Sequence, residues 1–120
     1  MFNHQPFSPE DALPPEQVRF SELHVEPWPD GRRVRVHITI TPFQKRPNLE
    51  ARIVNKDEEE TASISIIETM ENKMVFTMHI RGPIDEDPFT LQVRLSYEEQ
   101  GVVNQRDLEF YTSENPDQDA

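Results

Sequence analysis

Acidic side chains in three short segments are the residues of this chain best suited to bind a cation. The segments hold Asp30, the run Asp57-Glu58-Glu59-Glu60 and the run Asp85-Glu86-Asp87. Calcium takes roughly six to eight oxygen ligands, and carboxylates in flexible loops can supply them if the loops meet at one end of the fold. The carboxylates that would bind it are Asp30, Asp57, Glu59, Asp85 and Asp87. The alternative is that these segments are solvated loops that maintain solubility, because their spacing matches no EF-hand loop.

Histidine side chains form a second candidate set. His24, His37 and His79 occupy outward positions of stretches that the pattern predicts to be neighbouring strands. Three imidazole groups on one open sheet face could bind zinc or nickel, or act as a pH-responsive patch. The alternative is three ordinary surface histidines, since a zinc site also needs orienting partners that the sequence does not identify.

Catalytic motifs are not evident. No serine lies in a Gly-x-Ser-x-Gly turn, and the three isolated glycines cannot form a phosphate-binding loop. Adjacent acids such as Glu98-Glu99 cannot be told from the acidic background of the chain. We therefore predict that the protein is not an enzyme, has no catalytic residues and requires no cofactor.

Charge and composition narrow the class of partner. The 120 residues fit one domain, and 12 Lys+Arg against 23 Asp+Glu give a net charge of −11. Nucleic acid and anionic membranes would be repelled by this charge, so neither is expected as a partner. Cysteine is absent, which excludes disulfides and thiolate metal sites. With no apolar run of about 18 residues and no signal peptide, we expect a soluble, cytoplasmic protein.

Alternation of apolar and polar residues predicts seven half-buried strands. Their ranges are 18–26, 32–41, 48–55, 61–68, 73–81, 89–98 and 105–112. All eleven prolines lie outside the interiors of these strands, and all three glycines lie in predicted turns. We expect residues 1–17 to form a proline-rich arm that contacts the 18–112 domain through Phe2, Phe7 or Leu13, or stays loose. We expect the acidic tail, 113–120, to be disordered.

The first hairpin has a register that the turn predicts. A turn centred on Asp30-Gly31 places Leu23 opposite Ile38 and His24 opposite His37. The apolar positions change parity along the first strand, which predicts a bulge near Ser21-Glu22.

The last hairpin can be treated in the same way. A turn centred on Gly101-Val102 would place Leu95 opposite Leu108 and Val93 opposite Phe110. It would also place Arg94 opposite Glu109 on the outer face, as the first register places Glu26 opposite Arg35.

Prolines bracket the connections 42–47 and 83–88, which we interpret as crossings between sheets, and we interpret the other connections as hairpins. Seven antiparallel strands in about 100 residues resemble an immunoglobulin-like or fibronectin type III-like sandwich. The resemblance implies an all-β, seven-stranded antiparallel immunoglobulin-like β-sandwich with a short N-terminal arm. It is one of fold, and fold does not imply function.

Apolar residues in the predicted turns are the candidates for contact with a partner. They are Val102, Val103, Trp28 and Phe43. The alternative, which we favour for Trp28 and Phe43, is that these side chains fold back over the ends of the core, so Val102-Val103 is the best candidate for contact. We predict a non-catalytic binding or accessory module that contacts an unknown protein partner or forms a homo-oligomer, with a calcium-binding module as the alternative. The end of the sandwich opposite the acidic loops would carry Lys45, Arg46 and Lys73, so we also hypothesise head-to-tail contact between copies.

Overall fold

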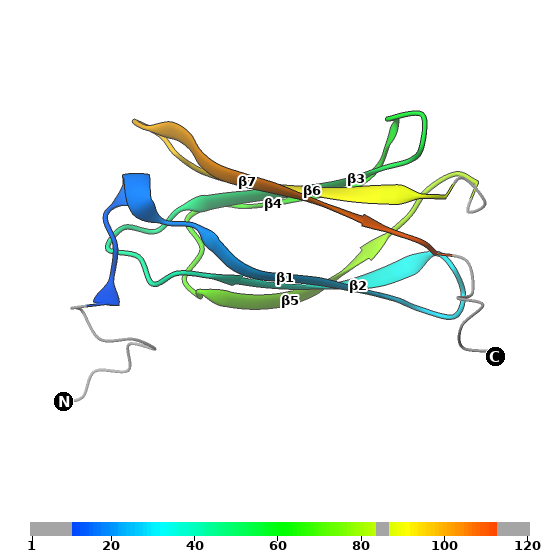
Figure 1. The fold of residues 1–120 in the computed structure, drawn as a ribbon, viewed down its shortest axis with the longest axis horizontal. Helices are drawn as coiled ribbons and strands as arrows, with labels where there is room; N and C mark the ends of the chain where they lie inside the picture. Colours follow the sequence, from blue (N-terminus) through cyan, green and yellow to red (C-terminus); the bar gives the residue numbers. More distant parts are fainter. Residues whose placement is uncertain (1–10, 84–86, 113–120) are drawn as a thin grey trace.

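Two antiparallel sheets pack face to face in a computed structural model that describes residues 11–83 and 87–112 (Figure 1). One sheet has the order β1 (Phe20–Pro27), β2 (Arg33–Ile40) and β5 (Lys73–His79). The other has the order β4 (Glu60–Ile66), β3 (Asn48–Val54), β6 (Phe89–Tyr97) and β7 (Gly101–Phe110). A short 3-10 helix, η2 (Pro15–Gln17), precedes them. The predicted seven-stranded antiparallel β-sandwich is confirmed, and the described residues contain no helix long and apolar enough to cross a membrane.

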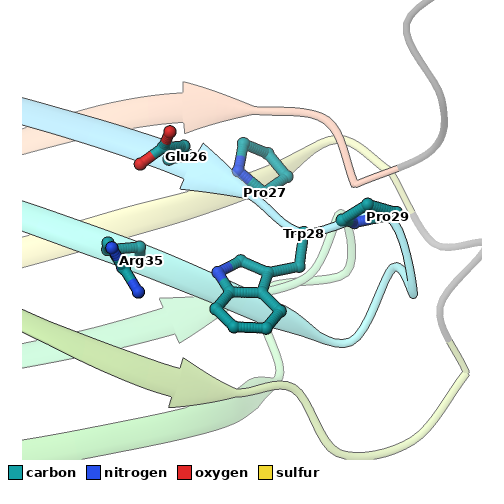
Figure 2. A pocket seen from close by; sticks show the side chains of 5 residues that line it. All are labelled: Glu26, Pro27, Trp28, Pro29 and Arg35. Atoms are coloured by element: carbon teal, nitrogen blue, oxygen red, sulfur yellow. The ribbon is translucent and has the colours of Figure 1, made fainter.

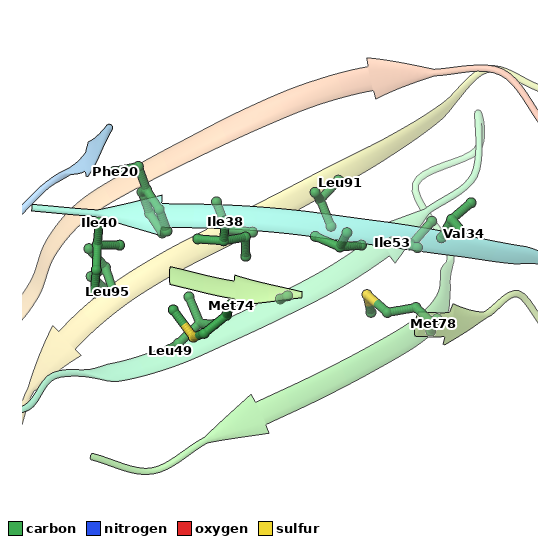
Figure 3. Close-up of a cluster of buried hydrophobic side chains, with 14 of the residues drawn as sticks. Phe20, Val34, Ile38, Ile40, Leu49, Ile53, Met74, Met78, Leu91 and Leu95 are labelled. Carbon is green, nitrogen blue, oxygen red and sulfur yellow. The ribbon is translucent and has the colours of Figure 1, made fainter. Parts of the chain in front are cut away.

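The core lies between the sheets and follows from the alternating pattern (Figure 3). On β2, Val34 and Ile38 are almost fully buried, and on β6 Leu91 and Leu95 are fully buried. Successive side chains of a strand point to opposite faces, so each strand contributes every second residue to this layer. The expected inward faces of the central strands are therefore correct.

The register of the first hairpin is confirmed. Leu23 lies opposite Ile38, and His24 lies opposite His37. A bulge lies between Phe20 and Glu22, where the change of parity predicted it. The predicted register is correct because the turn and the hydrophobic pattern independently require the same pairing.

The register predicted for the last hairpin is wrong by four residues. Leu108 lies opposite Leu91, Phe110 opposite Phe89, and Asn104 opposite Leu95. The reason is the turn, because β6 ends at Tyr97 and β7 begins at Gly101, with three residues between them. Gly101 has a φ of 75°, and a register shift between Leu95 and Ser96 completes a bulged hairpin of this length.

The shift also changes the expected charge pairs on the outer face. Arg94 lies opposite Gln105 rather than Glu109, and its Nε approaches Glu50 Oε1 on β3 at 3.9 Å. In the first hairpin Glu26 does lie opposite Arg35, yet its Oε1 is 3.2 Å from His37 Nε2 instead.

Three connections cross between the sheets, one more than predicted. The connections β2–β3 and β5–β6 cross as expected, and the connection β4–β5, expected to be a hairpin, also crosses. It is held against the start of β3, because Glu68 N donates to Asn48 Oδ1 at 2.8 Å and Thr69 N donates to Pro47 O at 2.9 Å. As a result β4 pairs with β3 and not with β5.

The arm contacts the domain at Leu13. Leu13 N donates to Pro42 O at 3.0 Å, Gln44 N donates to Leu13 O at 2.9 Å, and Leu13 forms a parallel bridge with Phe43. Leu13 is thus one of the three residues expected to make this contact. Phe2 and Phe7 lie outside the described residues, as does the tail 113–120.

Candidate binding surface

Trp28 occupies the connection between β1 and β2, between two prolines (Figure 2). Its backbone N–H donates to Arg33 O at 2.8 Å, which fixes the residue at the end of the hairpin. The Cζ atoms of Arg33 and Arg35 lie 4.1 and 5.7 Å from the indole ring centroid. A guanidinium over an indole face is attracted by the negative face of the ring. The half-buried indole is therefore held in place by arginine side chains of the neighbouring strand.

A shallow hollow of about 260 Å³ opens beside this ring. We call it the Trp28 hollow, and it is lined by Glu26, Pro27, Trp28, Pro29 and Arg35. Its wall combines rigid apolar groups with one carboxylate and one guanidinium. A surface of this kind can bind a protein segment that offers both apolar area and a charge.

The charges around the hollow are not all equally available. Arg33 Nε forms an ion pair with Asp30 Oδ2 at 2.8 Å, and Glu26 is 3.2 Å from His37. Arg35 is exposed, contacts the indole, and has no ion pair among the described interactions. Arg35 is accordingly the charged group that a partner carboxylate could reach.

Asp30 organises the turn. Its Oδ1 accepts hydrogen bonds from Arg32 N at 2.9 Å and Arg33 N at 3.1 Å. The backbone bond from Arg32, then the side-chain and backbone bonds from Arg33, lower the pKa of this carboxyl to about 2. Hydrogen bonds to the charged form favour it, so Asp30 is ionised at neutral pH and bound to its own turn.

The other acidic candidates have separate structural partners. Asn55 Oδ1 accepts from Asp57 N and Glu59 N, both at 2.9 Å, and Asn55 Nδ2 donates to Glu59 Oε1 at 3.0 Å. Asp87 Oδ1 accepts from the N–H and the hydroxyl of Thr112, at 2.8 and 3.0 Å. Asp85 lies outside the described residues.

Metal ligands do not converge in the part of the chain that the structure describes. Within 11–83 and 87–112, no group of three or more His, Asp or Glu side chains could hold a metal ion. The histidine set is separated, because the His24 and His37 ring centroids are 5.3 Å apart whereas His79 lies opposite Arg33, four residues along β2. The expected three-histidine cluster is thus reduced to a pair.

Of the four expected contact residues, only part of the set is accessible. Val102 is 49% exposed, and Val103 packs against the core. Phe43 agrees with the alternative favoured for it, because it is only 8% exposed and belongs to the hydrophobic core. Leu13 of the arm forms a bridge with Phe43 and packs against the same core.

Sequence reasoning missed four exposed large apolar residues. They are Ile67, Met70, Val75 and Tyr111. The sequence does indicate the exposure of Ile67, because Ile66 and Ile67 are consecutive and cannot both point from one strand into the core.

Comparisons with known proteins identify the fold alone. No protein-family description and no curated protein matches the chain. A β-glucuronidase from Parabacteroides merdae aligns with 78% of this chain and 14% of its own at 13% identity, with a TM-score of 0.62. A glycosyl hydrolase family 2 member from Bacteroides cellulosilyticus aligns with 77% of this chain and 14% of its own at 18% identity, with a TM-score of 0.58. A β-glucuronidase from Ruminococcus gnavus aligns with 78% of this chain and 15% of its own at 9% identity, with a TM-score of 0.52.

At these low sequence identities the structural alignments show similarity of fold alone, and that fold is an immunoglobulin-like β-sandwich. The chain spans only 14–15% of the length of these solved structures, so it corresponds to a small part of each.

Proposed function

We propose that this protein is a non-catalytic β-sandwich module that binds a protein partner through the Trp28 hollow. The observation that carries the proposal is the half-buried indole of Trp28 beside the exposed guanidinium of Arg35, which forms no ion pair with the residues that the structure describes. Tryptophan and arginine are the residue types that most often dominate the binding energy of protein interfaces. The partner would contribute a carboxylate to Arg35 and apolar area to the indole and the prolines.

Pre-organisation supports the proposal. Arg33 is held by Asp30 and lies over the indole, so the ring has little freedom to lose when a partner binds. Flanking prolines restrict the backbone on both sides of Trp28. Rigid binding groups favour affinity because less conformational entropy is lost on association.

The similarity to solved structures supports an accessory role. In each of the glycoside hydrolases compared, the aligned sandwich covers about a seventh of the chain. The acids whose hydrogen bonds are described, such as Asp30 and Asp87, bind groups of their own fold rather than one another. A module of this kind would act by binding and positioning.

Affinity capture from cells of the source organism, followed by titration with the purified partner, tests the proposal. Arg35→Glu should abolish capture, whereas Arg106→Glu, an equal charge change at an exposed position of β7, should not. The partner should also change the fluorescence of Trp28, the single tryptophan of the chain. Identical partners for the wild type and Arg35→Glu, with both proteins folded, would show that the Trp28 hollow is not the binding surface.

A further inference from the structure

Two large apolar side chains on the connection between β4 and β5 are exposed to solvent. Ile67 and Met70 are 72% and 68% exposed, the highest values among the large apolar side chains that the structure describes. They lie three residues apart on a bend that we call the 67–70 bend. Apolar area in water is unfavourable, so two such side chains on one short connection indicate a surface that another segment covers.

The 67–70 bend is held in place by hydrogen bonds to the start of β3. Glu68 N donates to Asn48 Oδ1 at 2.8 Å, and Thr69 N donates to Pro47 O at 2.9 Å. Thr69 itself is buried, so the inward position of the bend is already filled. The apolar side chains on either side of it therefore remain at the surface.

Charges at this end of the sandwich leave a small negative excess. The exposed bases of the arm, the connections and the strand ends are Arg19, Lys45, Arg46 and Lys73. The exposed acids there are Asp11, Glu16, Glu68, Glu71, Glu98 and Glu99. Four bases and six acids give a net charge of −2, which opposes an acidic segment and makes an uncharged apolar segment the better fit.

The arm joins the domain at the same end and runs toward the bend. Leu13 N donates to Pro42 O at 3.0 Å, and a parallel bridge joins Leu13 to Phe43. Because the bridge is parallel, the residues that precede Leu13 run beside those that precede Phe43, toward the end of β2. There Ile40 N donates to Asn72 O at 2.8 Å, and Asn72 lies two residues beyond the bend.

Segment 1–10 is long enough to reach the 67–70 bend. The path just described contains two backbone hydrogen bonds that each span about 5 Å and two stretches of two residues that each span about 7 Å, so it is no longer than about 24 Å. Phe7 and Phe2 precede Leu13 by six and eleven residues, which extend to about 20 and 36 Å. The required distance therefore lies within the range of these two residues.

The composition of segment 1–10 fits this surface. Residues 1–9, Met-Phe-Asn-His-Gln-Pro-Phe-Ser-Pro, contain no Asp, Glu, Lys or Arg, although the chain has a net charge of −11. Phe2 and Phe7 supply apolar area, and aromatic rings make favourable contacts with methionine sulfur. A segment tethered to the same chain also has an effective concentration of the order of millimolar, which a separate partner must exceed.

From these observations we propose that segment 1–10 folds over the 67–70 bend of its own chain. The rings of Phe2 and Phe7 then contact the two exposed apolar side chains, and the arm covers a surface that would otherwise be open to other proteins. This surface lies at the opposite end of the sandwich from the Trp28 hollow (Figure 1), so the contact is independent of the proposed binding function.

Paramagnetic relaxation measured by NMR on the full chain tests the position of the arm. The chain has no cysteine, so Ser8→Cys accepts a single nitroxide label. The label should broaden the amide signals of the 67–70 bend more than those of the connection 28–32. A mixture of nitroxide-labelled chain and isotope-enriched unlabelled chain should show no such broadening, because the contact is intramolecular. No broadening at the bend in the first sample, or equal broadening in the mixture, would overturn the proposal.

A double-mutant cycle tests the same contact through stability. Phe7→Ala should lower the urea midpoint of the wild type, and it should have no effect when Ile67→Ala/Met70→Ala is already present. Val102→Ala is the matched control, since Val102 is an exposed apolar residue at the same end, and in its background Phe7→Ala should keep its full effect. An equal effect of Phe7→Ala in all three backgrounds would show that the arm does not cover the bend.

Discussion

The Tyr97 hydroxyl donates a hydrogen bond of 2.8 Å to the backbone carbonyl of Lys45, which joins the end of β6 to the connection between β2 and β3. Tyr97 is 3% exposed, and burial raises its pKa to about 12. This bond holds one of the crossings between the two sheets against the end of the sandwich.

Replacing Tyr97 by phenylalanine should lower the free energy of unfolding by about 1 kcal/mol, the typical net value of one hydrogen bond. For a domain of roughly 100 residues this corresponds to a midpoint about 4–8 °C lower. Because the folded pKa is raised, the tyrosine contributes stability below about pH 10 and loses it as the pH rises through 12. Thermal melts at pH 7 and pH 11 measure both effects. Tyr111→Phe is the control, since Tyr111 is 58% exposed, and an equal loss in both variants would contradict the prediction.

Asp30→Asn should destabilise the protein at pH 7 by weakening the bonds that close the first turn. The pKa of Asp30 is lowered to about 2, so its contribution is present above about pH 4 and is lost as the pH falls through 2. Urea unfolding at a series of pH values should show the wild type and the variant converging over this range. Asp107→Asn, at an exposed position of β7, provides a charge-matched comparison. A stability difference that stays constant from pH 7 to pH 2 would exclude this role.

Asn104→Ala should lower the free energy of unfolding by about 1–3 kcal/mol, because Asn104 Oδ1 accepts a part-buried hydrogen bond from Phe20 N–H at 2.9 Å. This bond links β1 to β7, which belong to different sheets. Chemical denaturation measures the loss, and hydrogen exchange should show faster exchange of the Phe20 amide. Gln105→Ala, at the next and exposed position, should leave both unchanged. A stable variant with an unchanged Phe20 exchange rate would refute the link.

Phe43→Ala should destabilise the domain by about 3–5 kcal/mol, as expected for removal of a buried aromatic ring. Val102→Ala, at an accessible position, should change stability by no more than about 0.5 kcal/mol. Denaturant unfolding of the two variants checks the assignment of Phe43 to the core. Comparable small effects would instead place Phe43 on the surface.

Calcium should leave the thermal midpoint of EDTA-treated protein unchanged. Asp30 and Asp87 use their carboxylates to bind backbone and side-chain groups of the fold, and a calcium ion would have to compete with them. A ligand at a hundredfold excess over its Kd would stabilise the folded state by about 2.7 kcal/mol, which a melt detects readily. A rise that Asp87→Asn removes would establish the calcium site.

Local signals in the sequence were sufficient for the number of strands, for their buried faces and for the register of the first hairpin, whereas β7 begins at Gly101, four residues before the predicted start. Period-two alternation assigns each strand residue to a face, because side-chain direction is a property of the strand itself. At Asp30-Gly31 the turn and the hydrophobic pattern demand the same pairing, so Leu23 and Ile38 could be matched correctly. Trp28 was a candidate for the same local reason, since a bulky aromatic residue in a turn is costly to expose.

Contacts between distant segments required the tertiary structure. Phe43 forms a bridge with Leu13, thirty residues away in sequence. Glu26 lies opposite Arg35 but pairs with His37. Residue spacing predicts neither pairing, because in each case the side chain has several possible partners nearby in the folded protein.

The last hairpin separates what the local sequence determines from what the tertiary structure determines. A shift of four residues keeps every side chain of β6 and β7 on its own face, so the alternating pattern correctly predicted the faces. The pattern could not decide whether Leu108 lies opposite Leu95 or opposite Leu91. The tertiary structure made that choice through the three-residue turn before Gly101 and the stacking of Phe89 on Phe110, with ring centroids 6.0 Å apart. The sequence by itself determined which side of each strand is buried, because burial repeats every second residue. The packing of the whole domain decided which strands and residues meet, because those energies come from contacts that no local pattern contains.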